Sequence, residues 1–510
     1  MKFSLSALLA ACVFVALAAV PANAQKAKDT LRFPLNDGEA GLDPYLIPGT
    51  FNNTWEPSVF DNLLGFDPTK VNFVSLIAKS WSQSNPTTYE YELRDDVKFH
   101  DGDALDADDV VYTINYLIDP KVNLRYKAYW AWIASVEKLG PYKVRITSKS
   151  PVPDGMMWMA FNTSILPAHI HGPLADKQEF AARPVGTGPL KIARIEKNSG
   201  IVAEKNPIFK TVPGKKAATI GRIVSEPIPD SGTLAAKFMI GEVDVARDLP
   251  ADQTAALRDS GRAEFTLSAP SVGYSFLGFP SAGAQNVKAL GDPRVRLAII
   301  KAIDRQAVVK STFGDLAKGM APVEGLCSKE QLGCGYTKLV PDYDPAGAKK
   351  LLAEAGYADG FDVGISCFPT GQNEAIAISG MLRAVGIRAT VRAHPIAARV
   401  QMLNQGKVDI GYYGWSGGGM FEVSGQIVRH FLSKEYDDAD MLTMAAATMT
   451  MMDDAARRKE VAKLMDHANE KSYLIPMVSS RVTFTHTHEV KLDATEIRAN
   501  QVNPHDFQWK

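Results

Sequence analysis

The chain has 510 residues, of which 46% are hydrophobic and 22% are charged, and its 56 basic residues nearly balance its 57 acidic ones. This is the composition of a globular protein. The balanced charge, with no basic stripe, argues against nucleic acid and a bare membrane surface as partners. A chain of this length exceeds what one hydrophobic core usually supports, so we expect at least two lobes.

The first 24 residues have the three parts of a secretory signal peptide. Lys2 precedes a long apolar run, and Ala22-Asn23-Ala24 offers a small-residue cleavage site. Two alternatives stay open: a lipoprotein modified at Cys12, which ends a lipobox-like Leu-Ala-Ala-Cys, and a retained membrane anchor. The cleavage site favours removal of residues 1–24. No later segment approaches the roughly 20 apolar residues of a membrane span, so we expect an exported, periplasmic protein.

Three cysteines remain after the signal peptide. Cys327 and Cys334 flank a six-residue stretch in a Gly-rich loop, and export favours a disulfide between them. A zinc site would need more ligands than this loop offers. Cys367 stands in an apolar strand, and we expect it to be a buried free thiol.

Residues 80–120 predict a strand, a tight turn and a helix. Apolar and polar residues alternate over residues 89–94, and Asp101-Gly102 suits a turn. Asp106 suits the N-cap of the helix that follows. The apolar stripe of this helix consists of Val110, Val111, Ile114 and Leu117.

Two later regions repeat one order of elements. The first reads as a strand at residues 223–228, a helix at 234–240 and a turn into another strand. The second has a helix begun by Asp344-Pro345, a strand at 361–368, a helix at 374–384 and a strand at 387–391. Both copies close on Gly-x-Val-Asp and an apolar residue. The alternation predicts a parallel sheet in each of two α/β lobes, with a ligand cleft between them.

Several phrases resemble the solute-binding proteins of bacterial ABC importers, in the dipeptide/oligopeptide-binding family (family 5). The family writes a Trp, a strand, L-R-x-x-V-x-F-H-D-G and then T-A-x-D-V. The chain has this order from Trp81 to Val110, with Asp106 in the place of the Thr. Further family phrases are residues 183–189, 292–296, 302–305 and 355–357. The resemblance implies the bilobal type II periplasmic-binding-protein (Venus-flytrap) fold with an extra subdomain inserted in the first lobe.

On this reading the chain divides into six parts. They are the signal peptide (1–24), the first part of lobe 1 (25–65), the inserted subdomain (66–185), the second part of lobe 1 (186–277), lobe 2 (278–480) and a C-terminal return to lobe 1 (481–510).

The resemblance also implies where the solute would bind. The positions are Thr50, Phe51, Asn52, Gly186, Thr187, Gly188, Tyr274, Pro369, Thr370, Trp415, Gly417 and Gly418. Glycine-rich turns would expose backbone N–H groups, and the two aromatic rings would offer flat faces with one polar handle each. In peptide binders of the family, a carboxylate three residues after the cleft Trp pairs with the peptide ammonium. Here that position is Gly418, which favours a neutral or anionic solute unless Asp409 or Glu422 takes over.

Two other kinds of site compete with this reading. Gly414-Trp415-Ser416-Gly417-Gly418 matches the G-x-S-x-G elbow of serine hydrolases, which would make Ser416 a nucleophile. Fewer than about a hundred residues follow it, too few for the strands that usually come after such an elbow. His169 with His171, and His486 with His488, could each place two imidazoles on one face of a strand. Neither pair has a third ligand in the sequence, so we expect no metal, cofactor or catalytic residue.

The expected function is capture of a peptide-like or other small polar solute between two lobes and its delivery to inner-membrane ABC permease subunits. We expect a monomer. A sensor or chaperone with the same fold remains a further alternative, and the sequence does not name the solute.

Overall fold

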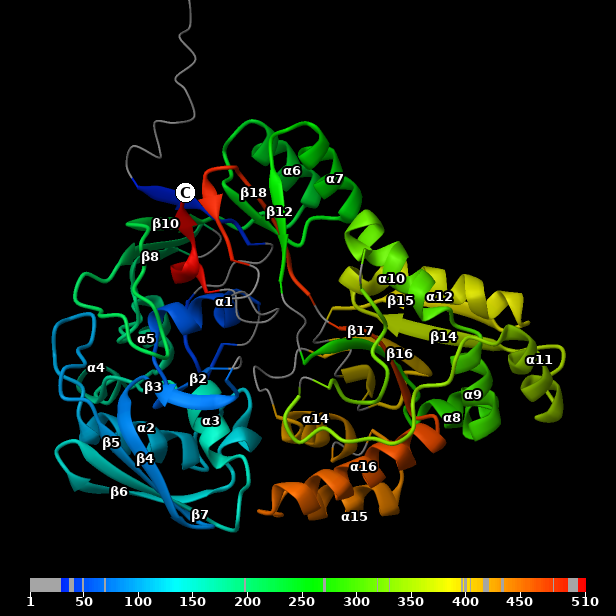
Figure 1. Ribbon diagram of the computed structural model, residues 1–510, viewed down its shortest axis with the longest axis horizontal. Helices are drawn as coiled ribbons and strands as arrows, with labels where there is room; N and C mark the ends of the chain where they lie inside the picture. The colour runs from blue at the N-terminus through cyan, green and yellow to red at the C-terminus, as the bar shows by residue number, and fades with distance from the viewer. Residues whose placement is uncertain are drawn as a thin grey trace, which may run out of the picture.

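The computed structural model describes residues 29–35, 41–47, 50–67, 70–196, 199–268, 272–318, 320–329, 331–395, 398, 401–403, 405–415, 422–432, 435–479, 481–493 and 503–510, without the side chains of residues 50–52. Residues 1–28, with the predicted signal peptide and Cys12, lie outside this set. Figure 1 shows two lobes, one with the first described strand and the C-terminus and one built from the middle of the chain.

The first lobe holds two sheets. One is four-stranded, in the order β1 (Thr30–Arg32), β10 (Arg222–Ser225), β9 (Gly200–Lys205) and β8 (Leu190–Glu196). The other is three-stranded, in the order β11 (Val245–Arg247), β18 (Thr483–His486) and β12 (Glu264–Leu267). Helices α1 (Thr50–Val59), α6 (Ser231–Met239) and α7 (Ala251–Asp259) and the short pair β19 (Val490–Lys491) and β20 (Gln508–Trp509) complete it.

A separate antiparallel sheet forms the inserted region. Its order is β4 (Ala78–Asn85), β5 (Thr88–Leu93), β7 (Lys143–Ser148) and β6 (Ile133–Gly140), and the hairpin β2 (Leu64–Asp67) and β3 (Asn72–Ser75) lies next to it. The helices of this region are α2 (Ala107–Ile118), α3 (Gly155–Phe161), α4 (Ala168–His171) and α5 (Gln178–Ala182).

The strand–turn–helix prediction for residues 80–120 is confirmed in detail. Asp106 caps α2 by accepting the backbone N–H of Asp108, and Asp109 accepts the N–H of Asp106 in return, which makes a capping box. Gly102 has φ +105°, the left-handed region that the predicted turn requires.

The second lobe is a five-stranded sheet with helices around it. The order is β15 (Arg388–Ala393), β14 (Asp362–Cys367), β16 (Ile410–Trp415), β13 (Tyr274–Gly278) and β17 (Leu474–Ser479). Its helices are α8 (Gly283–Asn286), α9 (Pro293–Lys301), α10 (Arg305–Phe313), α11 (Pro345–Glu354), α12 (Gln372–Ala384), α14 (Ser424–Gln426), α15 (Ala439–Thr448) and α16 (Asp454–Glu470).

The prediction of a parallel sheet in each lobe is correct for part of the second lobe's sheet and for one strand pair of the first lobe. In the second lobe β14 runs parallel to β15 and β16, whereas β13 is antiparallel to both of its neighbours. Among the described strands of the first lobe, only β1 and β10 form a parallel pair. Only three residues separate β8 from β9, too few for the crossover that a parallel pair needs, such as α12 between β14 and β15.

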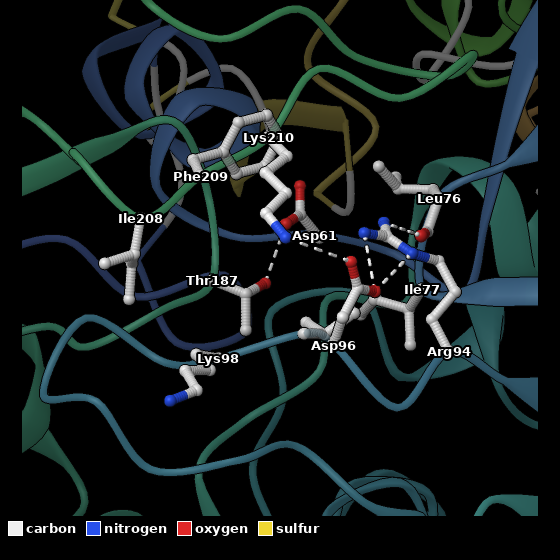
Figure 2. Close-up of a pocket in the computed structure, with 11 residues that line it drawn as sticks. Asp61, Leu76, Ile77, Arg94, Asp96, Lys98, Thr187, Ile208, Phe209 and Lys210 are labelled. Carbon is white, nitrogen blue, oxygen red and sulfur yellow. Dashed lines mark hydrogen bonds and ion pairs between the residues drawn. The ribbon is translucent and has the colours of Figure 1, made fainter.

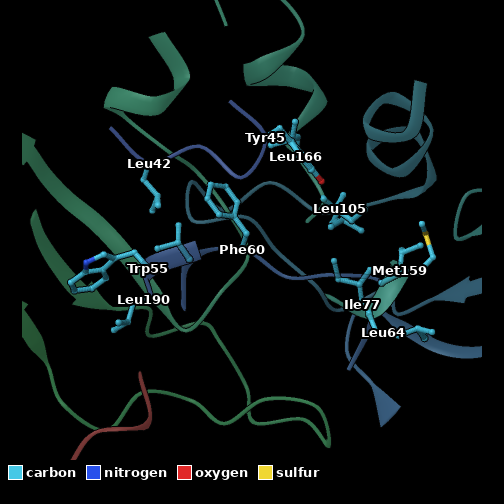
Figure 3. Close-up of a cluster of buried hydrophobic side chains, with 14 of the residues drawn as sticks. Leu42, Tyr45, Trp55, Phe60, Leu64, Ile77, Leu105, Met159, Leu166 and Leu190 are labelled. Carbon is cyan, nitrogen blue, oxygen red and sulfur yellow. The ribbon is translucent and has the colours of Figure 1, made fainter. Parts of the chain in front are cut away.

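Each lobe has its own apolar core. The first core runs without a break through the lobe and its inserted region. Figure 3 shows part of it, where Trp55 and Phe60 of the α1 region lie among leucines from distant parts of the chain. The second core surrounds the five-stranded sheet. The inserted region therefore shares the hydrophobic core of the first lobe.

The chain crosses between the lobes twice, once before β13 and once after β17 (Figure 1). The two crossings are hydrogen-bonded to each other, since Ser268 N donates to Val482 O (2.9 Å) and Val482 N donates to Ser268 Oγ (2.9 Å). Strand β13 belongs to the five-stranded sheet of the second lobe, so the boundary between lobes that the sequence predicts between residues 277 and 278 falls inside this strand. The strand after the second crossing, β18, belongs to the first lobe.

Candidate solute-binding site

A cavity of about 260 Å³ lies in the second lobe, where the carboxyl ends of β14 and β16 meet the end of β17. Ligands of open α/β sheets bind at such strand ends. Apolar surface makes up more of its lining than polar surface, and the rings of Phe313 and Phe368 contribute to it. The described lining residues are Ser275, Thr312, Phe313, Phe368, Thr370, Gly371, Glu374, Tyr412, Tyr413, Gly414, Val478, Ser479 and Arg481.

Two of the lining side chains carry opposite charge. Glu374 stands in the first turn of α12, is 8% exposed, and has its pKa raised because burial disfavours the charged form. Arg481 belongs to the second crossing between the lobes, where its Nη1 donates to Ser268 O (3.4 Å). The cavity therefore offers a partner for each end of a dipolar solute. One of the two charges, that of Arg481, belongs to the hinge.

Among the predicted site residues, Thr370 lines this cavity and several others stand next to lining residues. Pro369 is in the same short 3₁₀ helix as Thr370. Tyr274 precedes Ser275, and Trp415 follows Gly414. Gly417, Gly418 and Ser416 lie outside the described residues, as do the side chains of Thr50, Phe51 and Asn52.

The rings of Tyr274 and Trp415, which the sequence placed against the ligand, are packed in the second core in this structure. Tyr274 has no exposed surface; its hydroxyl donates to Leu326 O (2.9 Å) and accepts from Gln426 Nε2 (2.7 Å). Trp415 is 8% exposed and packs edge-on against Tyr274 at 5.6 Å between ring centroids. Strand alternation explains this, since successive side chains point to opposite faces of a sheet.

The segment Gly186-Thr187-Gly188 is hydrogen-bonded to other parts of the first lobe. Gly188 N donates to Val59 O (2.9 Å), Gly186 N to His100 Nδ1 (3.2 Å), and Thr187 Oγ1 to Asp61 Oδ2 (2.7 Å). A Cβ on Gly186 would lie 2.0 Å from Val59 O. The glycines allow close approach of the segment to the end of α1, and the backbone N–H groups of Gly186 and Gly188 already have partners within the protein.

Thr187 borders a second, much smaller pocket in the first lobe, shown in Figure 2 with Arg94, Asp96, Lys98 and Lys210 around it. Its volume is about 30 Å³, roughly the share of one water molecule in the liquid. It is too small for a solute.

The cysteines lie as the sequence predicts: Cys327 is disulfide-bonded to Cys334, with 5.9 Å between their Cα atoms, and Cys367 is a buried free thiol.

The histidine pairs do not form two-imidazole sites. His171 is buried beside Tyr112, while His169 is exposed on the same short helix and meets Asp101 (2.8 Å). His486 is buried, whereas His488 is exposed and pairs with Glu264. His169, Asp101 and Asp103 come within 4.8 Å of one another at the surface, but exposed acidic groups commonly meet in this way without an ion.

Sequence reasoning missed most of the cavity lining. The residues at the ends of β14 and β16 could have been found from the rule that ligands bind at strand ends. Glu374 could not, because an acidic residue in the first turn of a helix is sufficiently explained by the helix dipole. Ser275, Val478 and Arg481 depend on the antiparallel position of β13 and β17, which the sequence did not predict.

Comparisons with known proteins agree on one family. Residues 72–437 match the model of the bacterial extracellular solute-binding proteins, family 5. The chain is 28% identical over 424 residues to the glutathione-binding protein GsiB of Escherichia coli O1:K1, an alignment that covers 81% of this chain and 77% of the relative.

Solved structures share the fold. The DppA binding protein of Helicobacter pylori in complex with the peptide STSA has a TM-score of 0.77 at 20% identity, over 95% of this chain and 99% of that one. The substrate-binding protein CtaP of Listeria monocytogenes has a TM-score of 0.82 at 17% identity, over 94% and 99%.

These matches confirm the resemblance and the bilobal fold, and they give no support to the hydrolase alternative. In the described part of the chain, no helix is both long and apolar enough to cross a membrane. The family consists of binding proteins that bind peptides or small solutes and deliver them to inner-membrane ABC permeases. The chain belongs to the bacterial extracellular solute-binding proteins of family 5 and is the solute-binding component of an ABC importer, not an enzyme.

Proposed function

We propose that the 260 Å³ cavity of the second lobe is the solute site, and that the chain closes its two lobes on a small polar solute there. The observation that carries this proposal is the position of the cavity. It lies at the strand ends of one lobe and includes Arg481 from a crossing between the lobes. A solute that contacts Arg481 bears directly on the hinge, so its binding energy can favour the closed form.

Family membership also supports a location and a class of solute. We propose export to the periplasm by cleavage after residue 24, and action as a monomer. Relatives that bind glutathione and a short peptide support a peptide-like solute of a few residues at most.

A filled cavity tests the site. Gly414 lines it, and a Cβ added there meets no atom within 4 Å, so Gly414→Leu should fold normally and occupy the space of the solute. Gly380 of α12 is exposed and also has free space, which makes Gly380→Leu the matched control.

The measurement is native mass spectrometry of freshly purified protein, followed by calorimetry with any solute that copurifies. Wild type and Gly380→Leu should carry the solute and Gly414→Leu should lose it. Equal retention by the two variants would place the site elsewhere. Small-angle scattering should show a smaller radius of gyration with solute, and an unchanged radius would contradict closure.

A further inference from the structure

Asp409 and Glu422, the carboxylates that could take the place of the one missing at position 418, already accept hydrogen bonds from other residues of the protein. Asp409 Oδ2 accepts the N–H of Gly364 (3.0 Å) and its Oδ1 accepts from Asn286 (3.2 Å). Glu422 accepts from Arg457 Nη1 (2.6 Å) and from the backbone N–H of Ser424 (2.5 Å). Neither is available to a solute without loss of these bonds.

Glu374 differs from these two carboxylates in its hydrogen bonding. Its side chain is more than nine-tenths buried and borders the cavity, yet its Oε2 has no hydrogen-bond partner among the described residues. The Thr312 hydroxyl, which donates to Val308 O (2.9 Å) within α10, and the backbone N–H of Glu374 itself act on this carboxyl, but they lower its pKa less than burial raises it. A buried carboxylate is costly unless donors surround it. An ammonium group brings three donors and the opposite charge.

We propose that Glu374 is the anchor for a primary ammonium group of the solute, and that the solute is a zwitterion whose anionic end faces Arg481. This inference rests on the cavity being the solute site. It replaces the expectation, drawn from Gly418, of a neutral or anionic solute: the counter-charge for an amine is supplied by α12 instead of the segment after β16.

The test compares amine-bearing with amine-free probes by calorimetry. The first set consists of glutathione, a mixed di- to tetrapeptide pool and free amino acids. The second consists of the N-acetylated forms of all of these. Wild type should bind at least one amine-bearing probe, and its acetylated form should bind at least about 30-fold more weakly, the cost of an unpaired buried charge.

Two variants complete the test. Glu374→Gln keeps the shape of the side chain and should lose about 30-fold in affinity for the amine while its acetylated partner is unaffected. Glu354→Gln, a surface carboxylate of α11 in the same lobe, should change nothing. Thermal unfolding should show that both variants remain folded.

Three results would overturn the assignment: wild-type binding of acetylated and free probes alike, full affinity in Glu374→Gln, or no binding of any amine-bearing probe. None of them bears on the cavity itself, because Gly414→Leu tests that separately with the copurified solute.

Discussion

At the scale of single residues, the repeated Gly-x-Val-Asp phrase has a structural explanation. Asp244 Oδ2 accepts the backbone N–H of Arg32 in β1 (2.8 Å), and Asp409 Oδ2 accepts the backbone N–H of Gly364 in β14 (3.0 Å). Asp244 ties the start of β11 to β1 of a different sheet, and Asp409 ties the start of β16 to the neighbouring strand β14. The sequence revealed the repeat correctly, but its role is to hold the sheets together.

The two aspartates should differ in their contribution to stability. Asp244 is buried and also forms a two-pronged ion pair with Arg32, with Nε at 2.9 Å and Nη2 at 2.7 Å. Asp244→Asn should lower the free energy of unfolding by about 3 kcal/mol, because it leaves a largely buried guanidinium without its counter-charge. Asp409→Asn should cost about 1 kcal/mol, the value of ordinary hydrogen bonds. Urea unfolding measures both, and equal costs would contradict this account.

At the scale of elements, the loop closed by Cys327 and Cys334 forms part of the contact between the lobes. Leu332 forms an isolated parallel β-bridge with Glu422 of the second lobe, and Val423 N donates to Leu332 O (2.9 Å). The Leu332 side chain packs against the core of the first lobe. The disulfide therefore fixes a segment that touches both lobes. The sequence could predict the bond from export and spacing, but not this position.

Removal of the disulfide should weaken the fold by an amount set by loop length. For the double variant Cys327→Ser/Cys334→Ser we expect a loss of roughly 2–3 kcal/mol in the free energy of unfolding, because the reduced chain is freer when unfolded. Urea unfolding with and without a reductant checks this. The reductant should destabilise wild type by a similar amount and leave the double variant unchanged; an equal response of the two proteins would refute the assignment.

The elements also show where prediction from sequence stops. Helix starts were predictable because a capping side chain acts locally, as Asp106 and Asp344 do. Strand direction was not, because it depends on which strands become neighbours after the chain has crossed between lobes. The burial of Tyr274 and Trp415 follows from that same pairing of β13 with β16.

At the scale of the whole molecule, the lobes meet at a cluster of charged groups. Asp154 stands just before α3 in the inserted region, and in Figure 1 α3 faces α14 of the second lobe. From the second lobe, Glu422, Arg457 and the Ser424 hydroxyl act on Asp154; from its own region, the phenol of Tyr89 is nearby. All five residues are buried. Two carboxylates thus share one guanidinium.

This cluster should make closure depend on pH. Burial, then the Glu422 charge, raise the pKa of Asp154 to about 7, against the smaller opposing effects of Arg457 and Ser424. In the open form Asp154 would face water, with an ordinary pKa of about 3.9. The closed form therefore holds a proton that the open form releases. This contribution to closure is complete below about pH 4, declines as the pH rises toward 7, and is constant above that.

Solute affinity should accordingly fall between about pH 5 and 7, by at most about tenfold per pH unit. Calorimetry at pH 6 in two buffers of different ionisation enthalpy should show uptake of up to one proton on binding. Asp154→Asn, which mimics the protonated side chain, should keep the high affinity across this range and abolish the uptake. Protonation of Glu374 has the opposite effect on affinity, because it would weaken the binding of an ammonium group as the pH falls. Glu374→Gln removes this opposing effect, so its affinity should fall more steeply with rising pH than that of wild type. An unchanged pH profile in Asp154→Asn would show that the proton is taken up elsewhere.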